Sequence, residues 1–134
     1  MLAAPLLSGC EQAPASRSET MVNLATVQSG PQIQAQELEG AIARQPRNAS
    51  LYARRAAFRL DAGQVGAALE DINKAIDLDD APGEFHFTRA RALRAQNRLS
   101  TTLEAAQEAS RRGFSSPELN LLVGETQLDR KSVV

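Results

Sequence analysis

Side chains that could perform catalysis or hold a metal are few in this sequence and lie far apart. The chain contains one cysteine, Cys10, and one histidine, His86. Nucleophilic catalysis needs a nucleophile beside a base, and zinc sites need several cysteine, histidine or acidic ligands together. A single cysteine also excludes an internal disulfide bond. We therefore expect no enzymatic activity, no metal and no other cofactor, and we interpret His86 as a packing residue.

Composition and charge narrow the fold class and the kind of partner. Apolar residues make up 43% of the 134 residues, only 4% are aromatic, and tryptophan is absent. A core of small aliphatic residues favours packed helices over sheets, because strands prefer β-branched and aromatic residues. The net charge of −1 supplies no overall basic field for nucleic acid or anionic lipid. No apolar run is long enough to span a membrane. These features predict one all-α domain.

The single cysteine ends a short apolar segment. Leu7-Ser8-Gly9-Cys10 resembles the lipobox of bacterial lipoproteins, in which an apolar residue and two small residues precede the cysteine that receives the lipid. On this resemblance, residues 1–10 are a truncated signal segment, Cys10 is lipidated, and 11–30 form a linker. A signal peptide needs a basic start, but no Lys or Arg precedes Arg17. Either the start lies inside a longer gene product, or the match is accidental.

The elements that would position any site are indicated by an internal repeat. Arg55-Ala56 aligns with Arg89-Ala90, and Leu69-Glu70 aligns with Leu103-Glu104. Within the repeat, the apolar residues follow the spacing of one face of an α-helix, at Val65, Ala68, Leu69, Ile72, Ala75 and Ile76. The sequence therefore predicts paired helices with no strand between 49 and 112.

Capping residues agree with this period. Asn48 and Ser116 precede helical segments as N-caps, and Pro117 suits the first helical position. Gly63 and Asn97 stand at equivalent positions of successive repeats, and both are residue types that end helices in the left-handed conformation.

A period of about 34 residues, filled by a pair of helices, is typical of tetratricopeptide repeats, and the sequence resembles that family at specific positions. The matching residues are Tyr52 for its aromatic, Gly63 in the turn, Ala68 and Ala75 in the second helix, and Pro46 at the repeat boundary, with Ala56, Ala90 and Gly124 at the small crossing position. The resemblance implies a helical domain at 31–131. It contains units at about 15–48, 49–82 and 83–116 and a capping helix at about 117–129. The first unit would begin with a helix near Thr20–Gln28.

The resemblance also places two arginines inside the helix pairs. Arg55 and Arg89 occupy a position where the family often has leucine, and their aliphatic stems could pack there as apolar surface. Asp71 on the adjacent helix is the expected partner of Arg55. Ala105 stands at the equivalent place in the next unit, so we expect no such pair for Arg89.

In this family the first helix of each pair lines a concave groove. By resemblance, this groove carries Ala53, Ala57, Leu60, Phe87, Arg91, Arg94, Leu121 and Glu125. It would suit a peptide with apolar anchors and an acidic residue. Phe87 could instead fill space against a neighbouring helix, and the arginines could simply face solvent. Ala53 and Ala57 replace the Lys and Asn of the family's carboxylate clamp, which argues against recognition of a free peptide C-terminus.

The resemblances together imply a scaffold or adaptor with a protein or peptide partner, and with no nucleic acid or small-molecule substrate. We expect a lipid-anchored outer-membrane lipoprotein that faces the periplasm and serves a pilus, secretion or outer-membrane assembly; Glu11, which is not Asp, favours the outer membrane. The alternatives are a soluble cytoplasmic adaptor or chaperone, and a helical unit that only self-associates.

Overall fold

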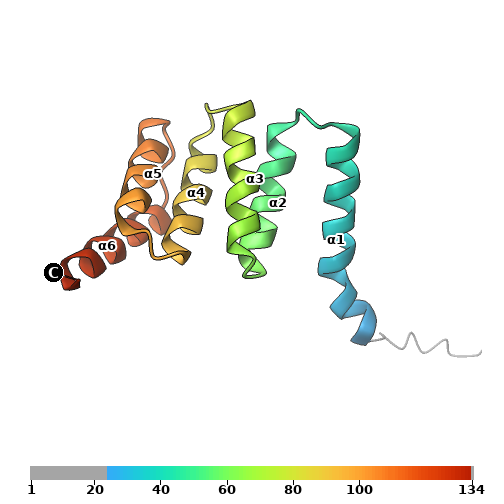
Figure 1. Ribbon diagram of the computed structural model, residues 1–134, viewed down its shortest axis with the longest axis horizontal. Helices are drawn as coiled ribbons and strands as arrows, with labels where there is room; N and C mark the ends of the chain where they lie inside the picture. Colours follow the sequence, from blue (N-terminus) through green and yellow to red (C-terminus); the bar gives the residue numbers. More distant parts are fainter. Residues whose placement is uncertain (1–23, 134) are drawn as a thin grey trace, which may run out of the picture.

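The computed structural model describes residues 24–133, and this part of the chain consists of six α-helices and no strands (Figure 1). The helices are α1 (Leu24–Arg44), α2 (Ala49–Asp61), α3 (Val65–Leu78), α4 (Gly83–Ala95), α5 (Leu99–Arg111) and α6 (Pro117–Ser132). The pairs α2/α3 and α4/α5 and the single helix α6 match the expected units, which confirms the all-α repeat fold. None of these helices combines the length and hydropathy needed to cross a bilayer. Cys10 lies outside the described residues.

Local sequence signals account for the helix boundaries. The side chain of Asn48 accepts a hydrogen bond from the Ser50 amide at 3.1 Å, and Ser116 accepts one from the Leu119 amide at 3.1 Å. These bonds satisfy amides that have no partner within the helix. The predicted N-caps of α2 and α6 are thus confirmed.

The two turns inside the helix pairs also follow the prediction. Gly63 has a φ of 77°, and Asn97, at the equivalent position of the next repeat, has a φ of 58°. Both lie in the left-handed region, which glycine enters freely and asparagine enters more readily than most residues. The equivalent turns therefore reverse the chain in the same way.

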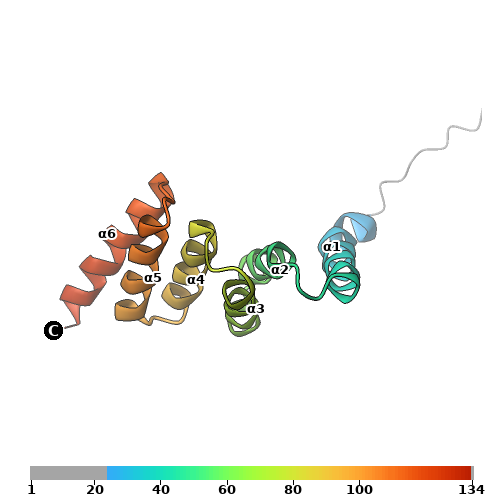
Figure 2. The same ribbon diagram turned by 90° about the horizontal axis from the view of Figure 1, so that it is seen from above.

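The helices form two rows. Helix α2 contacts α4 and α4 contacts α6, whereas α3 and α5 do not contact each other. Seen from above, α2 and α4 lie on one side of the stack and α3 lies on the other (Figure 2). Because the first row is the closer packed, we call the side formed by α2, α4 and α6 the inner face and the side of α3 and α5 the outer face.

Small residues form the core between the paired helices. One cluster contains Ala56, Ile72, Ala75 and Phe85; the other contains Ala90, Leu93, Ala105, Ala106, Ala109 and Leu119. Ala56 and Ala90 are fully buried, as predicted for the crossing position. Gly83, which the sequence interpretation overlooked, begins α4 so close to α5 that an added Cβ would lie 2.7 Å from the carbonyl oxygen of Ala109.

Two expectations about the ends of the repeat array are wrong. The first unit was expected to begin with a separate helix near Thr20–Gln28, but α1 runs without interruption from Leu24 through Pro31 to Arg44 and enters the presumed linker. Among the described helices, only α2 contacts α1, through a side that buries Leu38 and Ile42, while residues 30–34 are largely exposed.

The second correction concerns Gly124. It is exposed, and an added Cβ would meet nothing within 4 Å. The crossing position is close-packed only where the second helix of the same pair is present. In the described part of the chain, α6 has no such partner, so Gly124 lies at no crossing.

Candidate functional site

A shallow depression lies on the inner face between α2 and α4. Ala53 and Ala57 line it from α2, and their side chains are half-buried. The depression has a volume of about 200 Å³, and its other lining residues are Ser50, Arg54, Glu84, Phe85 and Thr88. Leu60 is half-buried but does not line this depression. The small alanine side chains thus leave room for a side chain of a partner.

Both predicted groove arginines form ion pairs across the inner face. Nη2 of Arg91 in α4 lies 3.2 Å from Oδ1 of Asp61 at the end of α2. Arg94, also in α4, pairs with Asp129 in α6. These ion pairs link α2 to α4 and α4 to α6. They also provide each guanidinium with a carboxylate from this chain, so a partner's carboxylate would have to compete for it.

Phe87 faces the C-terminal end of the stack. Its ring stacks on Phe114, with centroids 4.9 Å apart and an interplanar angle of 22°. It also packs against the core cluster that contains Leu119 of α6, and Leu122 and Val123 pack against the same cluster. This geometry supports the packing alternative for Phe87. The sequence interpretation missed Phe114, although an aromatic directly after Gly113 was a signal that the turn is anchored.

The C-terminal part of the inner face presents large apolar side chains to solvent. Leu121 is 61% exposed and Leu128 is 67% exposed, and both are in α6. Together with Glu125 they have the spacing i, i+4, i+7, which places them on one helical stripe. Leu128 was missed from sequence, although continuing the Leu121–Glu125 stripe by one turn would have found it.

The charge of the inner face differs from the basic groove that was expected. Arg91 and Arg94 are paired with carboxylates that remain accessible, since Asp61 and Asp129 are exposed. Glu84 and Glu125 are also exposed on these helices; neither forms an ion pair with another described residue. Arg54, which is exposed and lines the depression, adds a third guanidinium group to Arg91 and Arg94. Four carboxylates and three guanidinium groups therefore leave this surface close to neutral.

Comparisons with known proteins give the same architecture. No protein-family model matches the sequence, and no curated protein matches it. The TPR2B domain of yeast Sti1, solved as a complex with pHsp70, superposes with a TM-score of 0.70 at 23% identity, over 79% of this chain and 90% of that domain. The chain has the tetratricopeptide-repeat fold.

Two further structures support this assignment. The first TPR domain of Spaghetti (RPAP3), bound to the HSP90 peptide SRMEEVD, gives a TM-score of 0.73 at 16% identity over 81% of this chain and 86% of that one. The first TPR domain of human RPAP3, solved by NMR, also gives 0.73 at 16% identity, over 82% and 87%. The domains are of similar size, so the likeness spans a whole repeat array.

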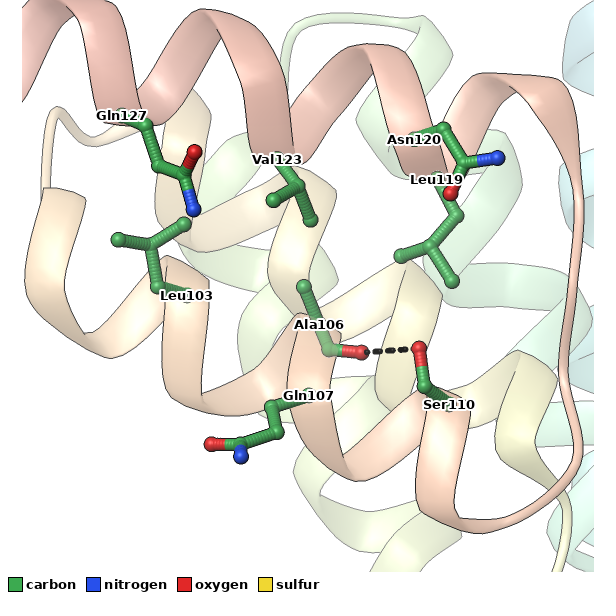
Figure 3. Close-up of a pocket in the computed structure, with 8 residues that line it drawn as sticks. All are labelled: Leu103, Ala106, Gln107, Ser110, Leu119, Asn120, Val123 and Gln127. Atoms are coloured by element: carbon green, nitrogen blue, oxygen red, sulfur yellow. Dashed lines mark hydrogen bonds between the residues drawn. The ribbon is translucent and has the colours of Figure 1, made fainter.

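The tetratricopeptide-repeat array has a second depression at its C-terminal end, between α5 and α6 (Figure 3). Its volume is about 420 Å³, and Leu103 and Ala106 of α5 face Leu119 and Val123 of α6 across it. Gln107, Ser110, Asn120 and Gln127 complete the lining.

Proposed function

We propose that this protein is a peptide-binding adaptor that uses the inner face of α2, α4 and α6. The observation that carries the proposal is the pair of exposed leucines, Leu121 and Leu128, on one stripe of α6. Large aliphatic side chains that gather on one exposed surface are typical of interaction sites. The depression beside Ala53 and Ala57 offers a second place for an apolar side chain of the same ligand.

The charges of the inner face favour a ligand with basic residues beside its apolar anchors. Arg91 and Arg94 already bind Asp61 and Asp129, whereas the carboxylate of Glu125 lies between the two exposed leucines on the same stripe. A Lys or Arg of the ligand would gain a partner there, and the attraction would weaken as salt is raised. This proposal replaces the acidic ligand that was expected from the sequence.

Selection from a displayed peptide library against the purified domain tests this function. We expect the selected peptides to combine aliphatic residues with Lys or Arg. Leu121→Ala and Leu128→Ala should each weaken their binding by roughly thirtyfold, the equivalent of about 2 kcal/mol for an anchor. The melting temperature should stay the same because both side chains are exposed.

The matched control is Ile33→Ala, which truncates an exposed aliphatic side chain on α1, at 49% exposure, and should leave binding intact. Glu125→Lys should weaken binding of the basic peptides and reduce its salt dependence. If no peptide is selected, or if binding survives both leucine substitutions, the inner face of α6 is not the binding site.

We further propose that the adaptor is lipid-anchored through Cys10 and holds a subunit of a bacterial envelope assembly. The support is the Leu7-Ser8-Gly9-Cys10 segment, followed by a polar, Pro-containing stretch that could serve as a tether. Expression of the full gene product in its native host with labelled lipid tests this. Label should enter the wild type and not Cys10→Ser, and the wild type should fractionate with the outer membrane. An unlabelled, soluble wild type would favour the cytoplasmic adaptor or chaperone instead.

A further inference from the structure

Arg89 is the counterpart of Arg55 in the second helix pair, but it lacks the partner that Arg55 has. Arg55 donates from Nε and Nη2 to Asp71 at 2.8 and 2.7 Å. Ala105 takes the place of Asp71 in the next repeat, and Arg89 forms no ion pair or hydrogen bond with any described residue. Its Nε atom is buried and has no acceptor. Burying an unsatisfied donor of a charged group is unfavourable. The Nη groups of Arg89 also have no acceptor among the described residues and are not among its buried atoms, so they are the donors that an acceptor from outside the chain could reach.

A second buried nitrogen without a partner lies at the same place. His86 is 5% exposed, and its Nε2 atom donates to the backbone carbonyl oxygen of Asp80 at 2.9 Å. Its other ring nitrogen, Nδ1, is buried and has no partner in the described part of the chain.

Both side chains line one pocket on the outer face. The pocket has a volume of about 270 Å³ and lies between α3 and α5, with α4 as its floor. Ile76, Leu93 and Ala105 supply its apolar part. A ligand there would be partly withdrawn from water, which strengthens a charge-assisted hydrogen bond.

The acidic residues at the rim of the pocket do not accept hydrogen bonds from Arg89. Asp80 and Glu108 line the pocket, but Arg112 binds both carboxylates, with Nη2 3.1 Å from Asp80 and Nε 2.8 Å from Glu108. Arg98 and Glu104 at the rim are exposed, and they carry opposite charges. The rim is therefore close to neutral, and the unpartnered guanidinium of Arg89 inside the pocket decides which charge it binds.

We propose that this pocket binds a carboxylate group, which takes beside Arg89 the place that Asp71 takes beside Arg55. The carboxylate would come either from an Asp or Glu side chain of a partner protein or from a free small carboxylic acid. The site is on the opposite side of the helix stack from the peptide-binding inner face, so it is a second site that does not depend on that function.

NMR of the arginine Nε–H groups tests the proposal directly. The probes are an N-acetylglutamate methylamide, which mimics a Glu side chain in a polypeptide, and succinate, each titrated at constant ionic strength against chloride. We expect a saturable shift of the Arg89 Nε–H signal and of the His86 ring. Arg89→Met should weaken binding about tenfold or more, because it removes every donor and keeps an apolar stem.

Ala105→Asp is the decisive variant, because it should supply the missing carboxylate from within the chain, as Asp71 does. Neither probe should then shift the Arg89 signal. Arg47→Met, which removes an exposed guanidinium from the turn between α1 and α2, is the matched control and should retain binding. Stronger binding of the glutamate mimic supports a protein side chain as the source, and stronger binding of succinate supports a free acid. The absence of a saturable shift, or an unchanged shift of the His86 ring in Arg89→Met, overturns the proposal even if Ala105→Asp does not fold.

Discussion

The carboxylate of Asp71 in α3 binds the guanidinium of Arg55 in α2 through two hydrogen bonds, at 2.8 Å from Nε and 2.7 Å from Nη2. Asp71 is only 4% exposed, and it also accepts a hydrogen bond from Arg59 at 2.8 Å. The bond to Asp71 is the main reason that the pKa of Arg55 is raised above its usual value. One buried carboxylate therefore holds two cations of the neighbouring helix.

Removal of this carboxylate should destabilise the domain severely. Asp71→Ala leaves Arg55 and Arg59 without their partner in a partly buried setting, and loss of one member of such a pair typically costs about 3 kcal/mol or more. Urea denaturation followed by circular dichroism measures the change. Glu70→Ala, at the exposed neighbouring position, is the control and should change stability by less than about 0.5 kcal/mol. Equal stability of the two variants would show that the pair contributes little.

Glycine-to-alanine substitutions should change the stability of the domain in opposite directions at Gly83 and Gly124. Gly83→Ala forces a Cβ against the carbonyl oxygen of Ala109 and should destabilise the domain by about 1–3 kcal/mol. Gly124→Ala adds a methyl group in open space inside α6 and should stabilise the domain by about 0.5–1 kcal/mol, since alanine favours the helix. Thermal melts of both variants provide the comparison. A destabilised Gly124→Ala would mean that another segment covers α6.

Truncation of Phe87 should lower the stability of the fold and should not act only on ligand binding. Phe87→Ala removes the stacking with Phe114 and the packing against the core cluster that contains Leu119, and should cost about 2–3 kcal/mol for a half-buried ring. Phe114→Ala should have a similar effect, and the double variant should be less destabilised than the sum of the two because the rings contact each other. Calorimetry of the three variants measures this coupling. If Phe87→Ala leaves the melting temperature unchanged, the ring is available as a binding anchor.

The ion pairs of Arg112 should make part of the stability depend on pH. Hydrogen bonds from Arg112 lower the pKa of Asp80, and those from Arg112 and Arg111 lower the pKa of Glu108. A carboxyl group whose pKa is lower in the folded than in the unfolded state stabilises the fold above its unfolded pKa. This contribution is lost as the pH falls through the folded pKa.

Arg112→Met should therefore raise the pKa of both carboxyl groups towards their ordinary values, as followed by NMR of the side-chain carboxyl carbons. The difference in unfolding free energy between wild type and variant should be present at neutral pH and disappear in strong acid. A difference that stays constant across this range would assign the effect of Arg112 to packing of its stem.

Short-range interactions are the part of this structure that the sequence alone determines. The apolar periodicity of 65–76, the Asn48 and Ser116 caps, and the left-handed turns at Gly63 and Asn97 involve residues a few positions apart, so their outcome barely depends on the rest of the chain. The repeat period extends this reasoning to one longer contact, Arg55 with Asp71, because equivalent positions in a repeat have equivalent neighbours.

Only the tertiary structure decides which surfaces are covered and which charges are paired. Gly124 stands at a position where the repeat predicts a close helix crossing, but no second helix packs on it in the described part of the chain. The segment before the first repeat forms one helix, α1, where the repeat pattern predicted a separate first helix. The pairing of Arg91 with Asp61 and of Arg94 with Asp129 spans 30 and 35 residues, and it neutralises the two arginines that were expected to make the inner face basic. Such contacts depend on the angle between successive helices, which is set by the packing of many side chains at once and is not encoded at any single position.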